Sequence, residues 1–193
     1  WSFNTLIEPT ATGQLFASGN ESISLSGDYL AVSQVNLAST ADAPSGGAHI
    51  YKRSGATWSL LQTIRAPGDL NSLANGNNKF AETVVLKGKY LVVSFQNYSN
   101  SSFIRTGRVV VYKRNISSGL YELDAILAPS NDVAEQQFGY ALDITNVENG
   151  TPRIVLTSQD NPYHTVYIFE RSEEVNGVAI WSVINSIPSV VDS

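Results

Sequence analysis

The chain contains no cysteine and no methionine, and only 2 of its 193 residues are histidine. Without cysteine, disulfide bonds and thiolate-based zinc or redox chemistry are excluded. Charged residues make up 15% of the chain, and the net charge is −5. Basic residues never cluster beyond pairs such as Lys52–Arg53, so we expect no nucleic-acid partner. No hydrophobic run approaches the roughly 18–20 residues of a membrane span, so we expect no membrane insertion.

What the chain does contain is one pattern written three times. The copies run from Phe16 to Pro67, from Phe80 to Pro129 and from Phe138 to Pro188. Equivalent aromatic residues recur roughly 60 residues apart. One set is Tyr51, Tyr112 and Phe169, and another is Trp58, Tyr121 and Trp181. A fixed repeat length is typical of solenoids and propellers, so the repeat governs our prediction of the fold.

Each copy has room for four short strands. In the first copy we expect them at Ile23–Leu25, Tyr29–Ser33, Ala48–Lys52 and Trp58–Ile64, with a hairpin turn in LSGDYL. No stretch has a convincing 3.6-residue period. We therefore predict an all-β fold: a β-propeller segment of three four-stranded antiparallel blades in one domain, residues 1–193. A β-sandwich is the alternative, although it does not explain the threefold recurrence.

The repeats resemble a known family. The segments QFGYALDI, LSGDYLAVS, GGAHIYKRSGATWSLLQTIRAP and TGRVVVYKR are similar to FG-GAP repeats, the blades of the integrin α-chain propeller, and more so to divergent microbial extracellular versions. Only the third copy keeps Phe138–Gly139, because Ala17 and Ala81 follow the phenylalanine in the others. The resemblance implies a propeller, an extracellular or cell-surface location, and a role in adhesion or ligand binding.

The chain departs from that family in two respects. Some members bind calcium between the first two strands, but here only the third loop offers oxygen ligands, at Asp143, Glu148 and Asn149, and Arg153 opposes a cation. We therefore expect no cofactor and no metal. Three blades are also few for a closed ring. Residues Trp1–Glu8 match the last strand of a blade, so we expect an extra strand from a preceding blade, and either further blades or self-association.

We find no pattern of catalytic residues and expect no enzymatic activity. His49 lies within a predicted strand, where we interpret it as a blade-face side chain at the position of Val109 or Val166. His164 follows Asn161–Pro162–Tyr163 and reads as a solvated loop residue. Neither comes with the nucleophile and orienting group that nucleophilic catalysis requires.

Function is therefore sought in the loops. The loop at 96–107 carries Tyr98, Phe103 and Arg105, residue types common at binding hot spots, so we predict ligand binding there. Five glycosylation sequons fall in expected loops, at Asn20, Asn97, Asn100, Asn115 and Asn149. The sequence thus predicts a recognition or adhesion module for protein or carbohydrate. The alternative is a structural subunit of a surface assembly or filament, joined by strand pairing between chains.

Overall fold

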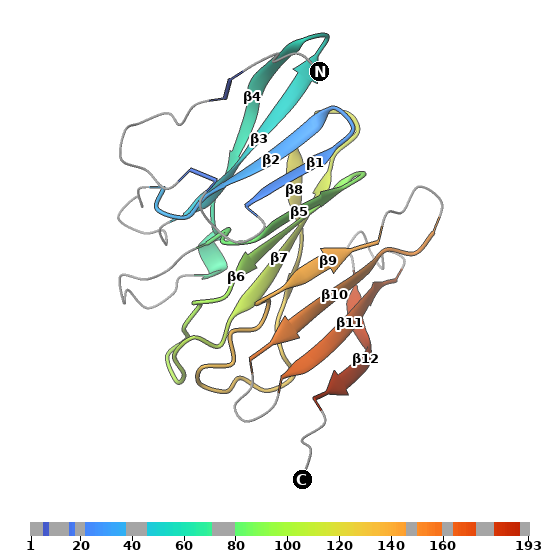
Figure 1. Ribbon diagram of the computed structural model, residues 1–193. Coiled ribbons are helices and arrows are strands. Elements are labelled where there is room, and N and C mark those ends of the chain that lie inside the picture. Colours follow the sequence, from blue (N-terminus) through green and yellow to red (C-terminus); the bar gives the residue numbers. More distant parts are fainter. Residues whose placement is uncertain are drawn as a thin grey trace.

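The computed structural model describes residues 6–7, 16–17, 22–37, 46–70, 80–145, 150–159, 164–172 and 180–189. Within these residues, the strands form three four-stranded antiparallel sheets. The only helical segment described is a 3-10 turn at Gly68–Leu70. Figure 1 shows the sheets following one another in an open series, from the blue and cyan strands through the green and yellow ones to the orange and red ones.

The three sheets have the same internal order of strands. Sheet 1 consists of β1 (Ile23–Ser26), β2 (Tyr29–Gln34), β3 (Gly47–Ser54) and β4 (Thr57–Ile64). Sheet 2 consists of β5 (Val84–Lys87), β6 (Tyr90–Phe95), β7 (Arg108–Arg114) and β8 (Tyr121–Leu127). Sheet 3 consists of β9 (Leu142–Ile144), β10 (Arg153–Ser158), β11 (Thr165–Arg171) and β12 (Trp181–Pro188).

Local sequence explains this hairpin order. Gly27 and Gly88 adopt φ values of 57° and 59° in the two-residue turns β1–β2 and β5–β6, a conformation that glycine reaches without strain. The same register recurs in every sheet, with a bulge at one place in the pairing of the third and fourth strands. Each residue of one sheet therefore has a definite counterpart in the others.

Two apolar clusters hold the series together. We call the side of a sheet that faces the preceding sheet its leading face and the opposite side its trailing face. In sheet 1, the leading face is the side with the same register positions as the leading face of sheet 2. The trailing face of sheet 1, including Ala31 and Ile50, packs on the leading face of sheet 2, including Val84 and Leu86. The trailing face of sheet 2 packs in the same way on the leading face of sheet 3. Such burial on both faces explains the continuous apolar runs in β5, β6 and β7.

A glycine–phenylalanine contact marks each of these two joints. Gly46 forms a parallel bridge with Phe80, and Gly107 forms one with Phe138. A Cβ atom at Gly46 would lie 2.2 Å from the Phe80 carbonyl oxygen, and one at Gly107 would lie 2.3 Å from the Phe138 nitrogen. The backbone of the next sheet therefore approaches too closely for any side chain at these positions.

The structure confirms an all-β fold with three four-stranded antiparallel sheets. They lie inside the three repeats that the sequence predicts. The strand predicted at Trp1–Glu8 falls mostly outside the described residues, and Leu6 and Ile7, which are described, are not part of a strand. The described part of the chain has no helix with the length and hydropathy needed to cross a bilayer.

Candidate functional site

The loop between β6 and β7 contains all three predicted binding residues. We call residues 97–106 the braced loop and residues 131–137, which lead from sheet 2 to sheet 3, the bracing segment. Hydrogen bonds run from the Glu135 N–H to the Ile104 carbonyl (2.9 Å) and from the Gln137 N–H to the Arg105 carbonyl (2.9 Å). The two segments thus fix each other's backbone.

Asn100 organises the interior of the braced loop. Its Oδ1 accepts the N–H groups of Ser102 (2.9 Å) and Phe103 (2.7 Å). Its Nδ2 donates to Asp132 in the bracing segment (2.6 Å). An asparagine that bonds the backbone two and three residues ahead closes a tight turn. This turn sets the direction in which Phe103 leaves the loop.

Arg108 anchors the base of the loop. Its guanidinium donates two hydrogen bonds to the Asp132 carboxylate, both of 2.8 Å. The side chains of this pair are only 12% and 23% exposed, so water screens them little. The same guanidinium lies over the Tyr98 ring, 4.6 Å from its centroid. Tyr98 also packs edge-on against Phe95, so its described contacts support the loop from below.

Arg105 faces solvent and pairs across the two segments. Its Nε lies 2.7 Å from the Glu135 carboxylate, and both side chains are more than two-fifths exposed. Arg105, Glu135 and Gln137 have φ values of 49°, 62° and 45°. Non-glycine residues in this region carry backbone strain, which concentrates at functional sites.

The tip of the braced loop exposes apolar side chains. Phe103 and Ile104 are 42% and 49% exposed, and Val133 of the bracing segment is 51% exposed. The sequence drew attention to Phe103 and Arg105, but Ile104, Asp132 and Val133 were missed. Asp132 is 24 residues from Arg108, and no local pattern links such distant partners.

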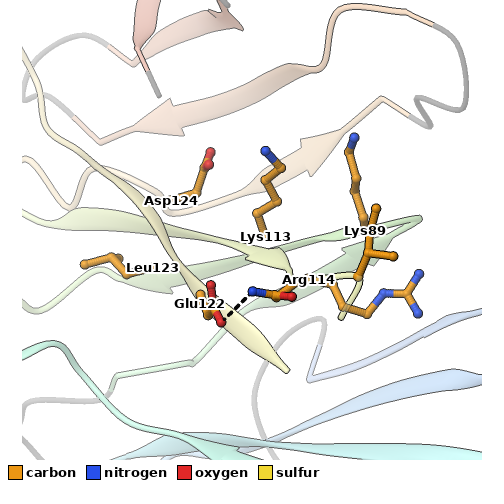
Figure 2. Close-up of a pocket in the computed structure, with 8 residues that line it drawn as sticks. Lys89, Lys113, Arg114, Glu122, Leu123 and Asp124 are labelled. Carbon is orange, nitrogen blue, oxygen red and sulfur yellow. Dashed lines mark hydrogen bonds between the residues drawn. The ribbon is translucent and has the colours of Figure 1, made fainter. Parts of the chain in front are cut away.

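A hollow lies at the end of sheet 2 opposite the braced loop. It has a volume of 420 Å³ and is lined by residues that include Lys89, Lys113, Arg114, Glu122 and Asp124. Figure 2 shows the two lysine side chains extending to the same side of the sheet, with Arg114 apart from them.

The carboxylates of this hollow are engaged within the protein. Asp124 accepts bonds from Arg171 and from the Trp181 indole (2.8 Å). Glu122 accepts a bond from Asn115 (3.0 Å), as the dashed line in Figure 2 shows. Asp124 therefore links this hollow to sheet 3, while Arg114 lies over the Tyr29 ring of sheet 1.

The two histidines occupy different environments. His49 is 3% exposed, and its ring nitrogens lie 2.6 Å from Gln34 Oε1 and 3.1 Å from Thr63 Oγ1. Burial, and secondarily the charge of Arg65, lower the pKa of His49. His164 is exposed, and its backbone N–H donates to the Ser189 hydroxyl. Within the described residues, no three His, Asp or Glu side chains gather as metal ligands would.

The sequons lie at loops and turns where they are described. Asn97 and Asn100 belong to the braced loop, and Asn115 begins the β7–β8 turn, where its Oδ1 accepts the Ser117 N–H (2.8 Å). Asn20 and Asn149 lie outside the described residues, as do Glu148 and its part of the third loop. Asp143, expected from the sequence in the third loop, instead lies within β9, and it pairs with Lys87 across the joint between sheets 2 and 3 (2.6 Å).

Comparison with known proteins adds no relative to this description. No protein-family model and no curated protein sequence matches the chain. The function must therefore be argued from the braced loop itself.

Proposed function

We propose that this chain is a non-enzymatic recognition module, built from propeller-type blades like FG-GAP repeats, that binds a protein partner through the braced loop. One observation carries the proposal: Phe103 and Ile104 are exposed at 42% and 49% on a loop whose backbone is fixed by Asn100, Asp132 and Arg108. Binding residues commonly sit on loops held by a rigid sheet scaffold.

Rigidity matters because binding must offset the entropy lost when a loop is ordered. A loop already held in one conformation loses less on association, so more of its contact energy appears as affinity. The bracing segment provides this order before any partner arrives. The strained φ values of Arg105 and Glu135 support the same interpretation, since strain persists only where the surroundings impose it.

The chemistry of the tip favours a protein over a sugar. Phe103, Ile104 and Val133 present apolar surface, and the side chains of Ile104 and Val133 have no group that could form a hydrogen bond with a sugar hydroxyl. Arg105 and Glu135 lie beside them as an exposed ion pair. An apolar centre with a charged margin is the usual composition of a protein interface.

An extracellular or cell-surface location is part of the proposal. It is supported by the FG-GAP resemblance and by the five sequons, three of which lie at described loops or turns. Glycans at such positions can be accommodated without disturbing a sheet.

The test is a binding screen against purified secreted and cell-surface proteins, with an array of glycans in parallel. Phe103→Ala should weaken binding to a protein hit by roughly thirtyfold, the effect of losing a hot spot of about 2 kcal/mol. Ile116→Ala is the matched control, because Ile116 is 93% exposed but lies at the β7–β8 turn.

Two results would contradict the proposal. Binding that Phe103→Ala and Ile116→Ala affect equally would remove the braced loop as the site. Hits confined to glycans would refute the choice of a protein partner. Asn100→Ala should also weaken binding although the Phe103 side chain is retained. It removes the hydrogen bonds that hold the loop in one conformation, so more entropy is lost on binding.

A further inference from the structure

The two ends of the series expose residues that are buried elsewhere in the repeat. On the leading face of sheet 1, Val32 and His49 are only 3% exposed, but Ile23 and Leu25 of the edge strand β1 are 58% and 63% exposed. Their counterparts by register are Val84 and Leu86 in sheet 2, and Leu142 and Ile144 in sheet 3, and all four are at most 5% exposed. We call Ile23, Leu25 and the half-buried Leu30 the leading patch.

The trailing face of sheet 3 shows the complementary difference. Val155 and Ile187 are 41% and 52% exposed. Their counterparts are Ala31 and Ile64 in sheet 1, and Val92 and Leu127 in sheet 2, and these are at most 4% exposed. We call Val155, Ile168 and Ile187 the trailing patch.

We propose that the trailing patch of one copy docks on the leading patch of a second copy of this chain. The two patches are the unmatched halves of a joint that the chain already forms twice internally. A second copy supplies both missing halves at once. The contact is therefore continuous in kind with the two joints seen within the chain, and it joins sheet faces rather than strand edges.

An aromatic pair at each internal joint has a counterpart between copies. Tyr29 packs edge-on against Tyr121 across the first joint, and Tyr90 packs against Trp181 across the second, each with ring centroids 6.1 Å apart. By register, Arg153 of sheet 3 stands where Tyr29 and Tyr90 stand in the other sheets. Trp58 of sheet 1 stands where Tyr121 and Trp181 stand. A guanidinium over an indole ring is a favourable pair, so this position matches.

A carboxamide offers a second match. Gln62 on β4 donates to the Tyr121 carbonyl (3.0 Å) and accepts the Tyr121 N–H (2.8 Å) across the first joint. Asn185 occupies the same register position on β12, opposite Ile168 as Gln62 is opposite Ile50. Asn185 is exposed and offers the same donor and acceptor to the backbone at Trp58 of a second copy.

One position makes the contact between copies weaker than the internal joints. His164 precedes β11 where Gly46 and Gly107 precede β3 and β7. Those glycines admit the backbone of the next sheet's phenylalanine, and a histidine does not. Phe16 of a second copy therefore lacks the bridge that Phe80 and Phe138 form. The association then depends on the patches alone and should be reversible and concentration-dependent.

Two different patches that fit each other form either a ring or a filament. Two copies contribute six sheets, a number within the about four to eight blades of closed propellers. We therefore expect a closed dimer, in which each copy uses both patches.

The experiment is sedimentation equilibrium between about 1 µM and 1 mM, the range of reversible association. Leu25→Glu disables the leading patch and Ile187→Glu the trailing patch. Both side chains are more than half exposed, so neither change should unfold the protein, and circular dichroism checks this. The control is Ile116→Glu, at the β7–β8 turn. The wild type and the control should dimerise, and each patch variant alone should stay monomeric.

Mixing the two variants tests the head-to-tail arrangement. A Leu25→Glu copy keeps an intact trailing patch and an Ile187→Glu copy an intact leading patch, so an equimolar mixture should form a one-to-one complex at the upper concentrations. A wild type that remains monomeric throughout would overturn the proposal. So would patch variants that dimerise like the control, or a mixture that forms no complex at the highest concentration.

Discussion

At the scale of single residues, His49 shows how a shift of one position in the alignment of the repeats changes the face of the sheet on which a side chain lies. The sequence suggested the position of Val109 or Val166. The register instead pairs His49 with Val32 and Thr63, which makes it the counterpart of Val110 and Tyr167. Because side chains alternate along a strand, this shift moves His49 to the other face of sheet 1. It is buried there against Gln34 and Thr63.

This burial predicts a pH dependence of stability. Burial lowers the pKa of folded His49 below its ordinary value of 6.5, so the unfolded chain binds this proton more readily than the folded one. The contribution of neutral His49 to the free energy of unfolding should be complete above about pH 6.5. It should fall as the pH drops and level off below the pKa of His49 in the folded protein. Urea unfolding between about pH 5 and 8 measures this.

His49→Val is the control for that series, because valine stands at the same position in sheet 2. The variant should have a flatter pH profile over this range, whatever its absolute stability. A wild-type profile as flat as that of the variant would show that His49 does not titrate on unfolding.

At the scale of elements, most strands could be predicted from the sequence, whereas the contacts that hold the braced loop could not. The sequence placed strands at Tyr29–Ser33 and Trp58–Ile64, and they run at Tyr29–Gln34 and Thr57–Ile64. Strand pattern and turn glycines are local signals that repeat three times. The braced loop, in contrast, depends on Asp132 meeting Arg108, a pairing that only the tertiary fold creates. The sequence therefore identifies Phe103 as a candidate binding residue, but it does not identify the Asp132–Arg108 pair that fixes its loop.

The glycines of the joints give a prediction at this scale. Gly107 has a φ of +79°, and a Cβ atom there would lie 2.3 Å from the Phe138 nitrogen, whereas Gly119 has a φ of +75° and open space around it. Gly119→Ala should cost only the strain of a left-handed residue, about 1 kcal/mol. Gly107→Ala should cost about 1–3 kcal/mol more, because the added methyl group forces the joint apart.

Urea unfolding of the two alanine variants measures the difference directly. Equal losses of stability would mean that the joint between sheets 2 and 3 does not depend on the close approach of the Phe138 backbone to Gly107. A larger loss for Gly119→Ala would contradict the role assigned to the Gly107 joint.

At the scale of the whole molecule, the sheets form a chain of neighbours. The main contacts between sheets link β5 to β1 and β2, and β9 to β5 and β6. In such a series, stability is the sum of each unit and its joints. The sequence indicated repeated units, but it could not show how neighbouring sheets are joined.

Asp124 tests whether the third sheet depends on its joint. Its side chain is 6% exposed and binds Arg171, itself 10% exposed. Asp124→Ala should cost about 3 kcal/mol, because it leaves a buried guanidinium without its carboxylate. Hydrogen exchange should accelerate in β9–β12 and stay unchanged in β1–β4.

Asp28→Ala is the control for that experiment. It removes the Arg53–Asp28 pair, whose side chains are 48% and 55% exposed, and should cost at most about 1 kcal/mol. Uniform acceleration of exchange across all strands after Asp124→Ala would show that the series unfolds as one unit.

The bracing segment couples partner binding to the arrangement of the sheets, since the chain that holds the loop of Phe103 also connects sheet 2 to sheet 3. A partner that contacts Ile104 and Val133 together contacts both the braced loop of sheet 2 and the segment that leads to sheet 3. By thermodynamic linkage, such a partner would stabilise the contact between the two segments, and any change that separates them would weaken its binding.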